Sequence, residues 1–141
     1  MTKSKWIEAA ARAQADWCHE IVSAHGCVGC FDERVWWCDG EPPEFHPSAV
    51  TLRADASPQD VVRGDLVSDS WCALDLASFG YRPAFEATWL VRGDSPGLVR
   101  FVVTDADEVP EGQLVLYDRE PAPYVAIGFR PLGSLRVWRR S

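Results

Sequence analysis

The chain has 141 residues, 47% of them hydrophobic and seven of them Trp, and its 21 acidic and 14 basic residues give a formal net charge of −7. This composition excludes a disordered chain, and the length suits one domain with a sizeable core. The negative charge repels nucleic acid, no stretch has the roughly 20 apolar residues of a membrane span, and no secretory leader begins the chain, so we expect a cytoplasmic protein without nucleic-acid or membrane partners.

The first predicted element is a long amphipathic helix from about Trp6 to His25, which ends before Gly26. The next segment, residues 26–48, is rich in Gly and Pro and carries an apolar patch around Trp36 and Trp37. For this segment we predict a long loop, or a loop with one helical turn. Long structured loops in small domains are usually functional or lid-like, and a plain covering flap is the alternative.

After residue 48 the sequence predicts an alternation of short strands and short helices. A short helix begins at Pro58, with Ser57 as its N-cap. Apolar runs predict strands at residues 49–52, 66–70, 83–92, 98–104, 113–117 and 133–139, and a single helical turn at residues 123–127. The sequence therefore predicts an α+β fold with a mostly antiparallel mixed sheet, a long N-terminal helix and short helices.

A four-residue phrase, Gly-aromatic-Arg-Pro, occurs at residues 80–83 and again 48 residues later at 128–131. Each copy enters an apolar segment that carries a Trp, and each follows a predicted short helix. We expect the Gly to adopt the left-handed conformation, the aromatic ring to fill the core, and the Pro to hold the chain extended. Two copies are too few for a repeat array, so we interpret them as a duplicated half-domain. Residues 1–93 and 94–141 would then be two units of one compact domain.

A short helix that ends in Gly-Tyr or Gly-Phe before a closing strand resembles the carboxy-terminal part of GNAT-type N-acetyltransferases. Residues 69–76, 85–89 and 128–138 look like both ends of longer actinobacterial GNAT-like proteins. The resemblance implies a GNAT-like fold and acetyl transfer from acetyl-CoA. In that family, a loop of the form Arg or Gln, two residues, Gly, one residue, Gly or Ala leads into a helix whose N–H groups hold the pyrophosphate.

The nearest string to that loop, residues 130–135, departs from the family pattern. It lacks the final small residue and leads into a predicted strand. The sequence therefore predicts no cofactor, with acetyl-CoA as the alternative.

The chain has five Cys, an odd number, and we expect them to be reduced. Cys27 and Cys30 have the two-residue gap that allows two sulfurs to bind one tetrahedral zinc at about 2.3 Å. Cys38 and His25 would complete such a site. Because there is no second Cys-x-x-Cys and the other spacings are unorthodox, we predict no metal and keep this set as the alternative.

Three side chains are candidates for acid–base catalysis: Glu86, Asp69 and His46. Strand alternation places Glu86 on the face opposite Phe85 and Trp89, where it is either a solvated carboxylate or, if that face lines a cleft, a base. Asp69 is also a candidate cap that accepts hydrogen bonds from backbone N–H groups. The candidate ligand-binding aromatic residues are Trp36, Trp37, Trp71, Trp89 and Tyr81.

These features lead to a first hypothesis of a GNAT-like protein that binds, or acts on, a small molecule in a Trp-rich cleft without CoA. The first alternative is an active acetyl-CoA-dependent N-acetyltransferase. The second is a protein-interaction module that forms a homodimer by pairing or exchanging its last strand as an exposed edge. Whether the protein is an enzyme stays open at this stage.

Overall fold

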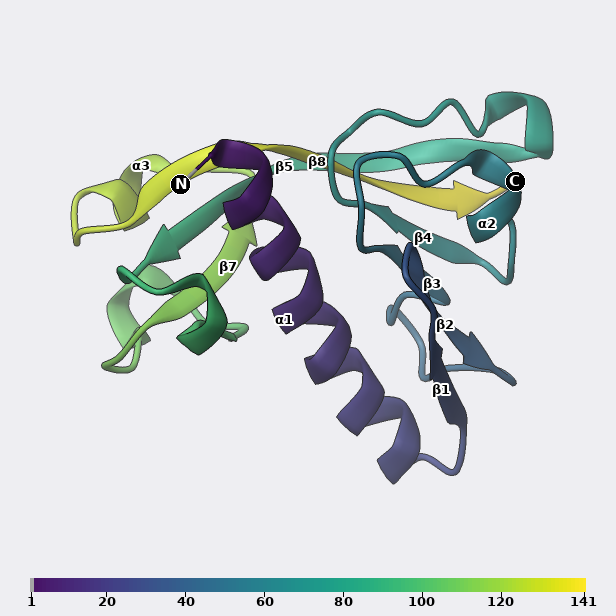
Figure 1. Cartoon of the computed structure of the whole chain (residues 1–141), viewed down its shortest axis with the longest axis horizontal. Coiled ribbons are helices and arrows are strands. Elements are labelled where there is room, and N and C mark those ends of the chain that lie inside the picture. The colour runs from purple at the N-terminus through teal and green to yellow at the C-terminus, as the bar shows by residue number, and fades with distance from the viewer. Residues whose placement is uncertain (1) are drawn as a thin grey trace.

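The computed structural model describes residues 2–141, which form a long helix, α1 (Lys3–Ala24), and a curled sheet of eight strands (Figure 1). The side chain of Thr2 caps α1 by accepting a hydrogen bond from the backbone N–H of Lys5, at 3.2 Å. The predicted long N-terminal helix and the α+β class are confirmed. Within residues 2–141, none of the helices is both long enough and apolar enough to cross a membrane.

The sheet is mixed and mostly antiparallel, as predicted. Its strands are β1 (Val28–Phe31), β2 (Val35–Asp39), β3 (Ala49–Thr51), β4 (Leu66–Asp69), β5 (Tyr81–Arg92), β6 (Arg100–Phe101), β7 (Leu114–Asp118) and β8 (Arg130–Arg140). They are ordered β1-β2-β3-β4-β8-β5-β7-β6, and only the β3–β4 and β6–β7 pairs are parallel among the described strands. Two short α-helices, α2 (Pro58–Val61) and α3 (Ala122–Val125), and 3-10 turns at Ala77–Phe79, Pro96–Leu98 and Ala106–Glu108 connect them.

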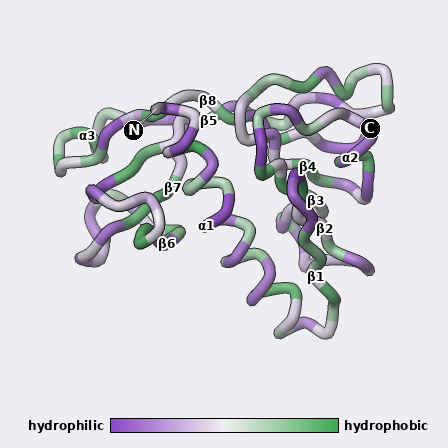
Figure 2. Tube along the Cα trace, in the orientation of Figure 1, coloured by the Kyte–Doolittle hydropathy of each residue, from purple (hydrophilic) through white to green (hydrophobic). Residues whose placement is uncertain are grey.

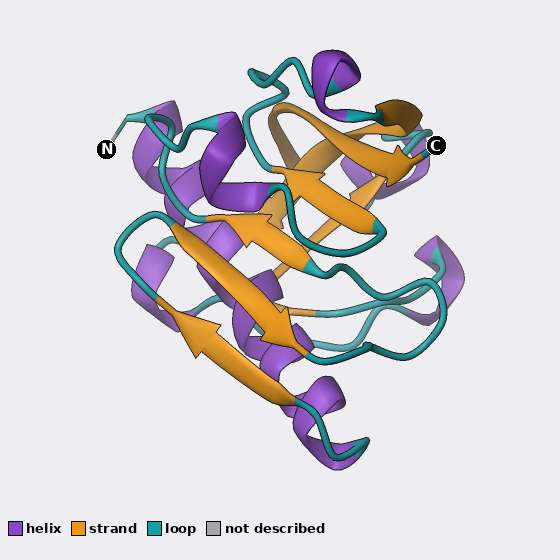
Figure 3. Cartoon of the chain, turned by 90° about the vertical axis from the view of Figure 1, so that its right-hand side faces the viewer, coloured by secondary structure: helices purple, strands orange, loops and turns teal. Residues whose placement is uncertain are grey.

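Helix α1 packs against one face of the curled sheet and contacts both of its halves (Figures 1 and 3). Its first turns, with Ile7 and Ala10, share a core cluster with Trp89 on β5. Its later turns, with Cys18, share a second cluster with Trp36 on β2. Apolar and polar residues alternate along α1 (Figure 2), so one stripe of the helix faces the sheet and the other faces solvent.

The prediction of a long loop at residues 26–48 is wrong for the first half of that segment, which forms the β1–β2 hairpin. The hairpin turn is held by Asp32, whose Oδ1 atom accepts hydrogen bonds from the N–H groups of Arg34 and Val35, both at 2.8 Å. Gly29 interrupts the apolar alternation of β1, which concealed the strand. A Cβ atom at Gly29 would collide with the imidazole of His19, so α1 requires this glycine.

Two further strand expectations are corrected by the structure. The strand expected at residues 98–104 is limited to β6, because the 3-10 turn Pro96–Leu98 takes up its beginning. The last strand, β8, is not an exposed edge, because it lies between β4 and β5. A dimer that pairs β8 edge to edge is therefore excluded in this fold, and the edges are formed by β1 and β6.

The two copies of the Gly-aromatic-Arg-Pro phrase occupy equivalent positions. Gly80 and Gly128 have φ angles of 86° and 100°, and each follows a helical turn and precedes a closing strand. Tyr81 and Phe129 are 3% and 2% exposed, so both rings fill the core as predicted. Each closing strand pairs with a strand of the other predicted unit: β8 pairs with β4, and β5 pairs with β7.

Candidate functional site

A surface loop, residues 40–48, lies where several hollows of the molecule meet. The loop is anchored at Ser48, whose N–H donates to the carbonyl of Leu66 at 2.7 Å, and inside the loop the N–H of His46 donates to the carbonyl of Pro43 at 3.1 Å. Phe45 has a φ of 68°, a conformation that bulky residues rarely adopt, and it is 75% exposed. The loop thus holds an aromatic side chain outside the core, next to His46.

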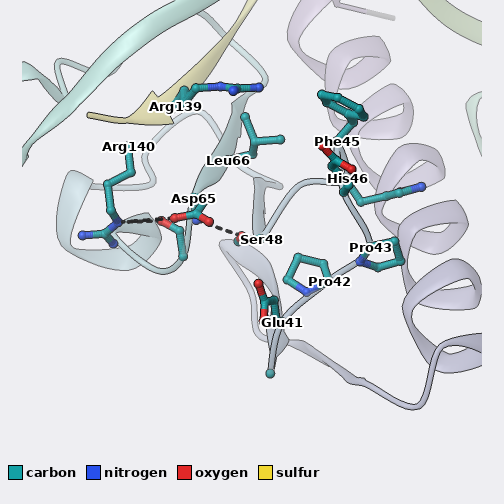
Figure 4. Close-up of a pocket in the computed structure, with 13 residues that line it drawn as sticks. Glu41, Pro42, Pro43, Phe45, His46, Ser48, Asp65, Leu66, Arg139 and Arg140 are labelled. Carbon is teal, nitrogen blue, oxygen red and sulfur yellow. Dashed lines mark hydrogen bonds and ion pairs between the residues drawn. The ribbon is translucent and has the colours of Figure 1, made fainter.

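The first hollow, which we call the loop hollow, has a volume of about 750 Å³ and lies between this loop, the start of β4 and the end of β8. Figure 4 shows Arg139 extending over it and Arg140 directed at Asp65. Arg140 is fixed there, because its guanidinium group donates to the carbonyl of Gly64 at 3.0 Å and to the Tyr81 hydroxyl at 2.8 Å. These contacts leave Arg139 as the less constrained of the two arginines.

The second hollow, the helix hollow, has a volume of about 610 Å³ and lies between α1, the loop, β7 and the chain after β6. The imidazole of His46 stacks on Trp17 of α1, with ring centroids 5.1 Å apart and an angle of 27° between the rings. His46 lines both this hollow and the loop hollow. It is therefore the one sequence-predicted catalytic candidate that borders these hollows.

The Nδ1 atom of His46 is buried and has no hydrogen-bond partner within residues 2–141. Burial lowers the pKa of this imidazole below its ordinary 6.5, and the nearby charge of His25 lowers the pKa further. His46 is therefore neutral at pH 7, with one polar atom uncommitted.

The third hollow, the arginine hollow, has a volume of about 420 Å³ and adjoins the helix hollow along Phe45, Pro47 and Tyr117. It lies on the face of the sheet that α1 also covers. Its lining combines apolar side chains with three arginines: Leu66, Phe85, Val137, Arg82, Arg119 and Arg139, in addition to the shared residues and Pro83 and Ala84.

Asp69 acts as the predicted cap. Its Oδ1 accepts from the N–H of Ala73 at 3.1 Å, and its Oδ2 accepts from the N–H of Leu74 at 3.0 Å and from the indole of Trp138 at 3.3 Å. The side chain is buried and its acceptor sites are used within the fold. In this conformation Asp69 stabilises the turn after β4.

Glu86 is a surface carboxylate whose side chain is 52% exposed and which forms an ion pair with Arg136. The hydrogen bonds from Arg136 are the main cause that lowers the pKa of Glu86. Asp69 and Glu86 are both register partners of Arg136, on either side of β8. His46 lies elsewhere, against α1, so the structure does not bring the three catalytic candidates together.

The five aromatic residues predicted to bind a ligand lie mainly in the core. Trp36 and Trp89 are fully buried and donate hydrogen bonds to His19 and to the carbonyl of Ser70. The Tyr81 hydroxyl donates to the carbonyl of Gly64, and Trp37 packs in the same cluster beneath Arg63. Trp71 lines a hollow of only about 10 Å³ beside the β3–β4 pair.

The cysteines do not form a metal centre in residues 2–141, where no group of three or more His, Cys, Asp or Glu side chains is placed to hold an ion. Cys27 belongs to the alternative zinc set, together with Cys30, Cys38 and His25. Its thiol instead donates a hydrogen bond to the carbonyl of Glu41 at 3.0 Å. Burial raises the pKa of Cys38 to about 11 and that of Cys18 to about 12.

The string at residues 130–135 is predicted to lead into a strand, and in the structure all of it lies inside β8. The start of α2 offers little to a pyrophosphate either. Pro58 has no N–H, and the carboxylate of Asp60 accepts from the N–H of Ser57 at 2.8 Å, which also lowers the pKa of Asp60. A negative charge at this terminus opposes an anionic ligand.

Sequence reasoning missed Trp17, Phe45 and the three arginines of the third hollow. Trp17 has the spacing of an ordinary core residue, and its contact with His46 joins segments far apart in the sequence. Arg82 lies in the repeated phrase, and the repeat indicates a structural role for the phrase rather than a binding role. Arg119 and Arg139 carry no local signal, because only the sheet brings them together.

Comparison with known proteins finds no family model, no curated protein and no solved structure that matches this chain. The site itself therefore supports the functional conclusion.

Proposed function

We propose that this protein binds a small molecule, without CoA, in the adjoining hollows beside His46, on a GNAT-like fold. The observation that carries the proposal is that His46 lines both the loop hollow and the helix hollow, and that its Nδ1 atom is buried without a hydrogen-bond partner within residues 2–141. Buried polar atoms without a partner are rare, because each lost hydrogen bond is costly, and a ligand group would satisfy this one.

The surroundings of His46 suit a small molecule. The two hollows of about 750 and 610 Å³ lie within the usual range of ligand sites, roughly 300–1,000 Å³. Trp17 and the exposed ring of Phe45 provide apolar surface, and Gln14 provides a further polar side chain. The neutral imidazole orients a ligand by hydrogen bonding, and it is also the residue of the site that would accept a proton from one.

Support for the GNAT-like part of the proposal comes from the two helical turns that end in left-handed glycines and lead into the closing strands β5 and β8. Support for binding without CoA comes from the start of α2, where Asp60 occupies the N–H of Ser57. We therefore propose a GNAT-like fold that binds a ligand other than CoA.

Histidine-selective NMR tests the proposal, because the chain has only three His residues. The protein, labelled with ¹⁵N in the imidazole rings, is titrated with amino acids, nucleosides, aromatic carboxylates and aromatic amines, one at a time. We expect saturable shifts of the His46 signals with at least one of these classes, and smaller shifts of His25. If the His46 signals stay unchanged at millimolar concentrations of every probe, the proposal fails.

Acetyl-CoA is tested separately by thermal unfolding. A ligand at about 100 times its dissociation constant stabilises a protein by about 2.7 kcal/mol. We expect no such stabilisation by millimolar acetyl-CoA. A saturable rise in melting temperature would instead favour the acetyltransferase alternative.

A further inference from the structure

The arginine hollow has an apolar floor and a positively charged rim. Leu66, Val137 and Phe85 form the floor, where strands β4, β8 and β5 continue the core cluster beyond the part that α1 covers. The rim carries Arg82, Arg119 and Arg139, and the described lining residues include no Asp or Glu. The hollow therefore has a positively charged rim in a chain whose formal net charge is −7.

These guanidinium groups are not neutralised by the fold. Within residues 2–141, Arg82, Arg119 and Arg139 form neither an ion pair nor a side-chain hydrogen bond, although Arg119 lies over the ring of Phe85, 4.8 Å from its centroid. Arg82 and Arg139 are also direct register partners on β5 and β8. Like charges in directly opposite positions destabilise a sheet, so an anion between them would relieve a cost.

The two arginines of the repeated phrase differ in this respect. Arg130, the counterpart of Arg82, donates to the carbonyl of Gly93 at 3.1 Å and lies over the ring of Trp6. It is occupied by contacts within the fold. Arg82 has no such partner within residues 2–141, and this difference favours a partner outside the chain.

We propose that the arginine hollow binds a small aromatic or branched apolar molecule that carries one oxyanion, such as a carboxylate. The inference rests on the proposed small-molecule function and names the class of its ligand. The planar guanidinium groups hold the oxyanion through paired, charge-assisted hydrogen bonds. The apolar body of the ligand lies on the floor and extends past Phe45 toward the helix hollow.

Calorimetric titration with two matched probes tests the inference. The probes are 1-naphthoate, which is an aromatic carboxylate, and 1-naphthamide, which has a similar shape without the charge. We expect saturable binding of 1-naphthoate and binding of 1-naphthamide that is weaker by about tenfold or more. The variants Arg82→Gln, Arg119→Gln and Arg139→Gln should each weaken 1-naphthoate binding severalfold, and Arg119→Lys, which keeps the charge and loses the fork, should also weaken it.

The matched control is Arg100→Gln. Arg100 is exposed on β6 and lies outside the lining of the three hollows, so the variant removes the same charge and should bind 1-naphthoate like the parent protein. Thermal unfolding without ligand separates binding from a structural role. We expect Arg82→Gln to melt at the same or a higher temperature, because it removes a like-charge pair, whereas a structural arginine would lower the melting temperature when replaced.

The inference is overturned if both probes bind equally, or if the three Gln variants bind 1-naphthoate like the parent protein. Either result leaves small-molecule binding itself intact. If neither probe binds at millimolar concentration, the inference is also overturned. The His46 titration then decides the proposed function independently, because its panel includes uncharged and cationic compounds.

Discussion

The indole N–H of Trp138 donates a hydrogen bond to Oδ2 of Asp69 at 3.3 Å, and so ties β8 to the end of β4. The other Trp of the repeat, Trp89, donates to the neighbouring carbonyl of Ser70 at 2.8 Å. The indoles of the two closing strands, β8 and β5, therefore donate hydrogen bonds to Asp69 and Ser70, which are consecutive residues of one turn. Asp69 stabilises this turn from inside the fold.

Replacing Asp69 with Ala should destabilise the protein by about 3 kcal/mol, because two backbone N–H groups and one indole N–H lose their acceptors in a buried place. Asp69→Asn should cost less, since the amide oxygen still accepts one or two of these bonds. Urea unfolding monitored by Trp fluorescence measures both values.

Glu86→Gln is the comparison variant for Asp69→Ala, because Glu86 is the other carboxylate among the predicted catalytic candidates. Its pairing with Arg136 is exposed, and we expect the midpoint of unfolding to change little. A loss of stability with Glu86→Gln as large as that with Asp69→Ala would contradict the assignment of Asp69 as the buried cap.

Gly80→Ala and Gly128→Ala should destabilise the protein by similar amounts, about 1–2 kcal/mol each, because both positions have φ angles in the left-handed region. Neither new Cβ atom meets another atom within 4 Å, so the cost comes from the backbone alone. The double variant should show the sum of the two effects, measured by chemical unfolding.

Gly97→Ala is the matched control for these glycine variants. A Cβ atom at Gly97 also has open space, but the backbone there is not left-handed. We expect this substitution to be neutral or stabilising. If Gly97→Ala costs as much as Gly80→Ala, backbone conformation is not the reason for the glycine that the two phrases share.

The imidazole of His46 should titrate below pH 6.5 in the folded protein, because burial disfavours its charged form. The unfolded chain then takes up a proton on His46 at a higher pH than the folded protein does. Stability from this group is complete above pH 6.5 and is lost as the pH falls toward the folded pKa. NMR titration of the labelled imidazoles measures the pKa directly.

His46→Gln provides the control for the pH effect. In this variant the free energy of unfolding should fall less between pH 6.5 and pH 5 than in the parent protein. A folded pKa of His46 at or above 6.5, or equal pH dependence of the two proteins, would show that the ring is solvated rather than buried.

Cys18 should resist alkylation in the folded protein. With a pKa of about 12, on the order of one thiol in 10,000 is ionised at pH 8, and the side chain is buried as well. We expect iodoacetamide at pH 8 to label the partly exposed Cys27, Cys30 and Cys72 and to leave Cys18 unmodified, as read by peptide mass spectrometry. The same reaction in concentrated urea should label all five cysteines. Rapid labelling of Cys18 without urea would reveal an opening of α1 away from the sheet.

Much of the fold could be predicted from local sequence. The spacing of apolar residues defined α1, and Ser57 with Pro58 defined the start of α2. The β1–β2 hairpin could not be recognised, because Gly29 breaks the strand pattern for the sake of a contact with His19 on α1. The need for this glycine comes from a tertiary contact, whereas in the sequence alone a glycine at this position is typical of a loop.

The site was less predictable than the fold. The residue type of His46 predicts reactivity, and the structure adds its stacking on Trp17 and its buried Nδ1 atom. Trp36 and Trp89 were expected in a cleft, but large aromatic side chains bury equally well in a core, and composition does not distinguish the two. Arg82 and Arg139 become neighbours only through the β5–β8 register, over a long separation in sequence.

The pairing of β4 with β8 has a consequence for biosynthesis. β4 pairs on one side with β3 and on its other side with β8, which follows much later in the sequence. While the chain is being translated, that side of β4 presents free backbone N–H and C=O groups until residues 130–140 have left the ribosome. The nascent protein therefore exposes an unpaired strand edge between the emergence of β4 and that of β8, and chaperones that shield such edges should raise its yield.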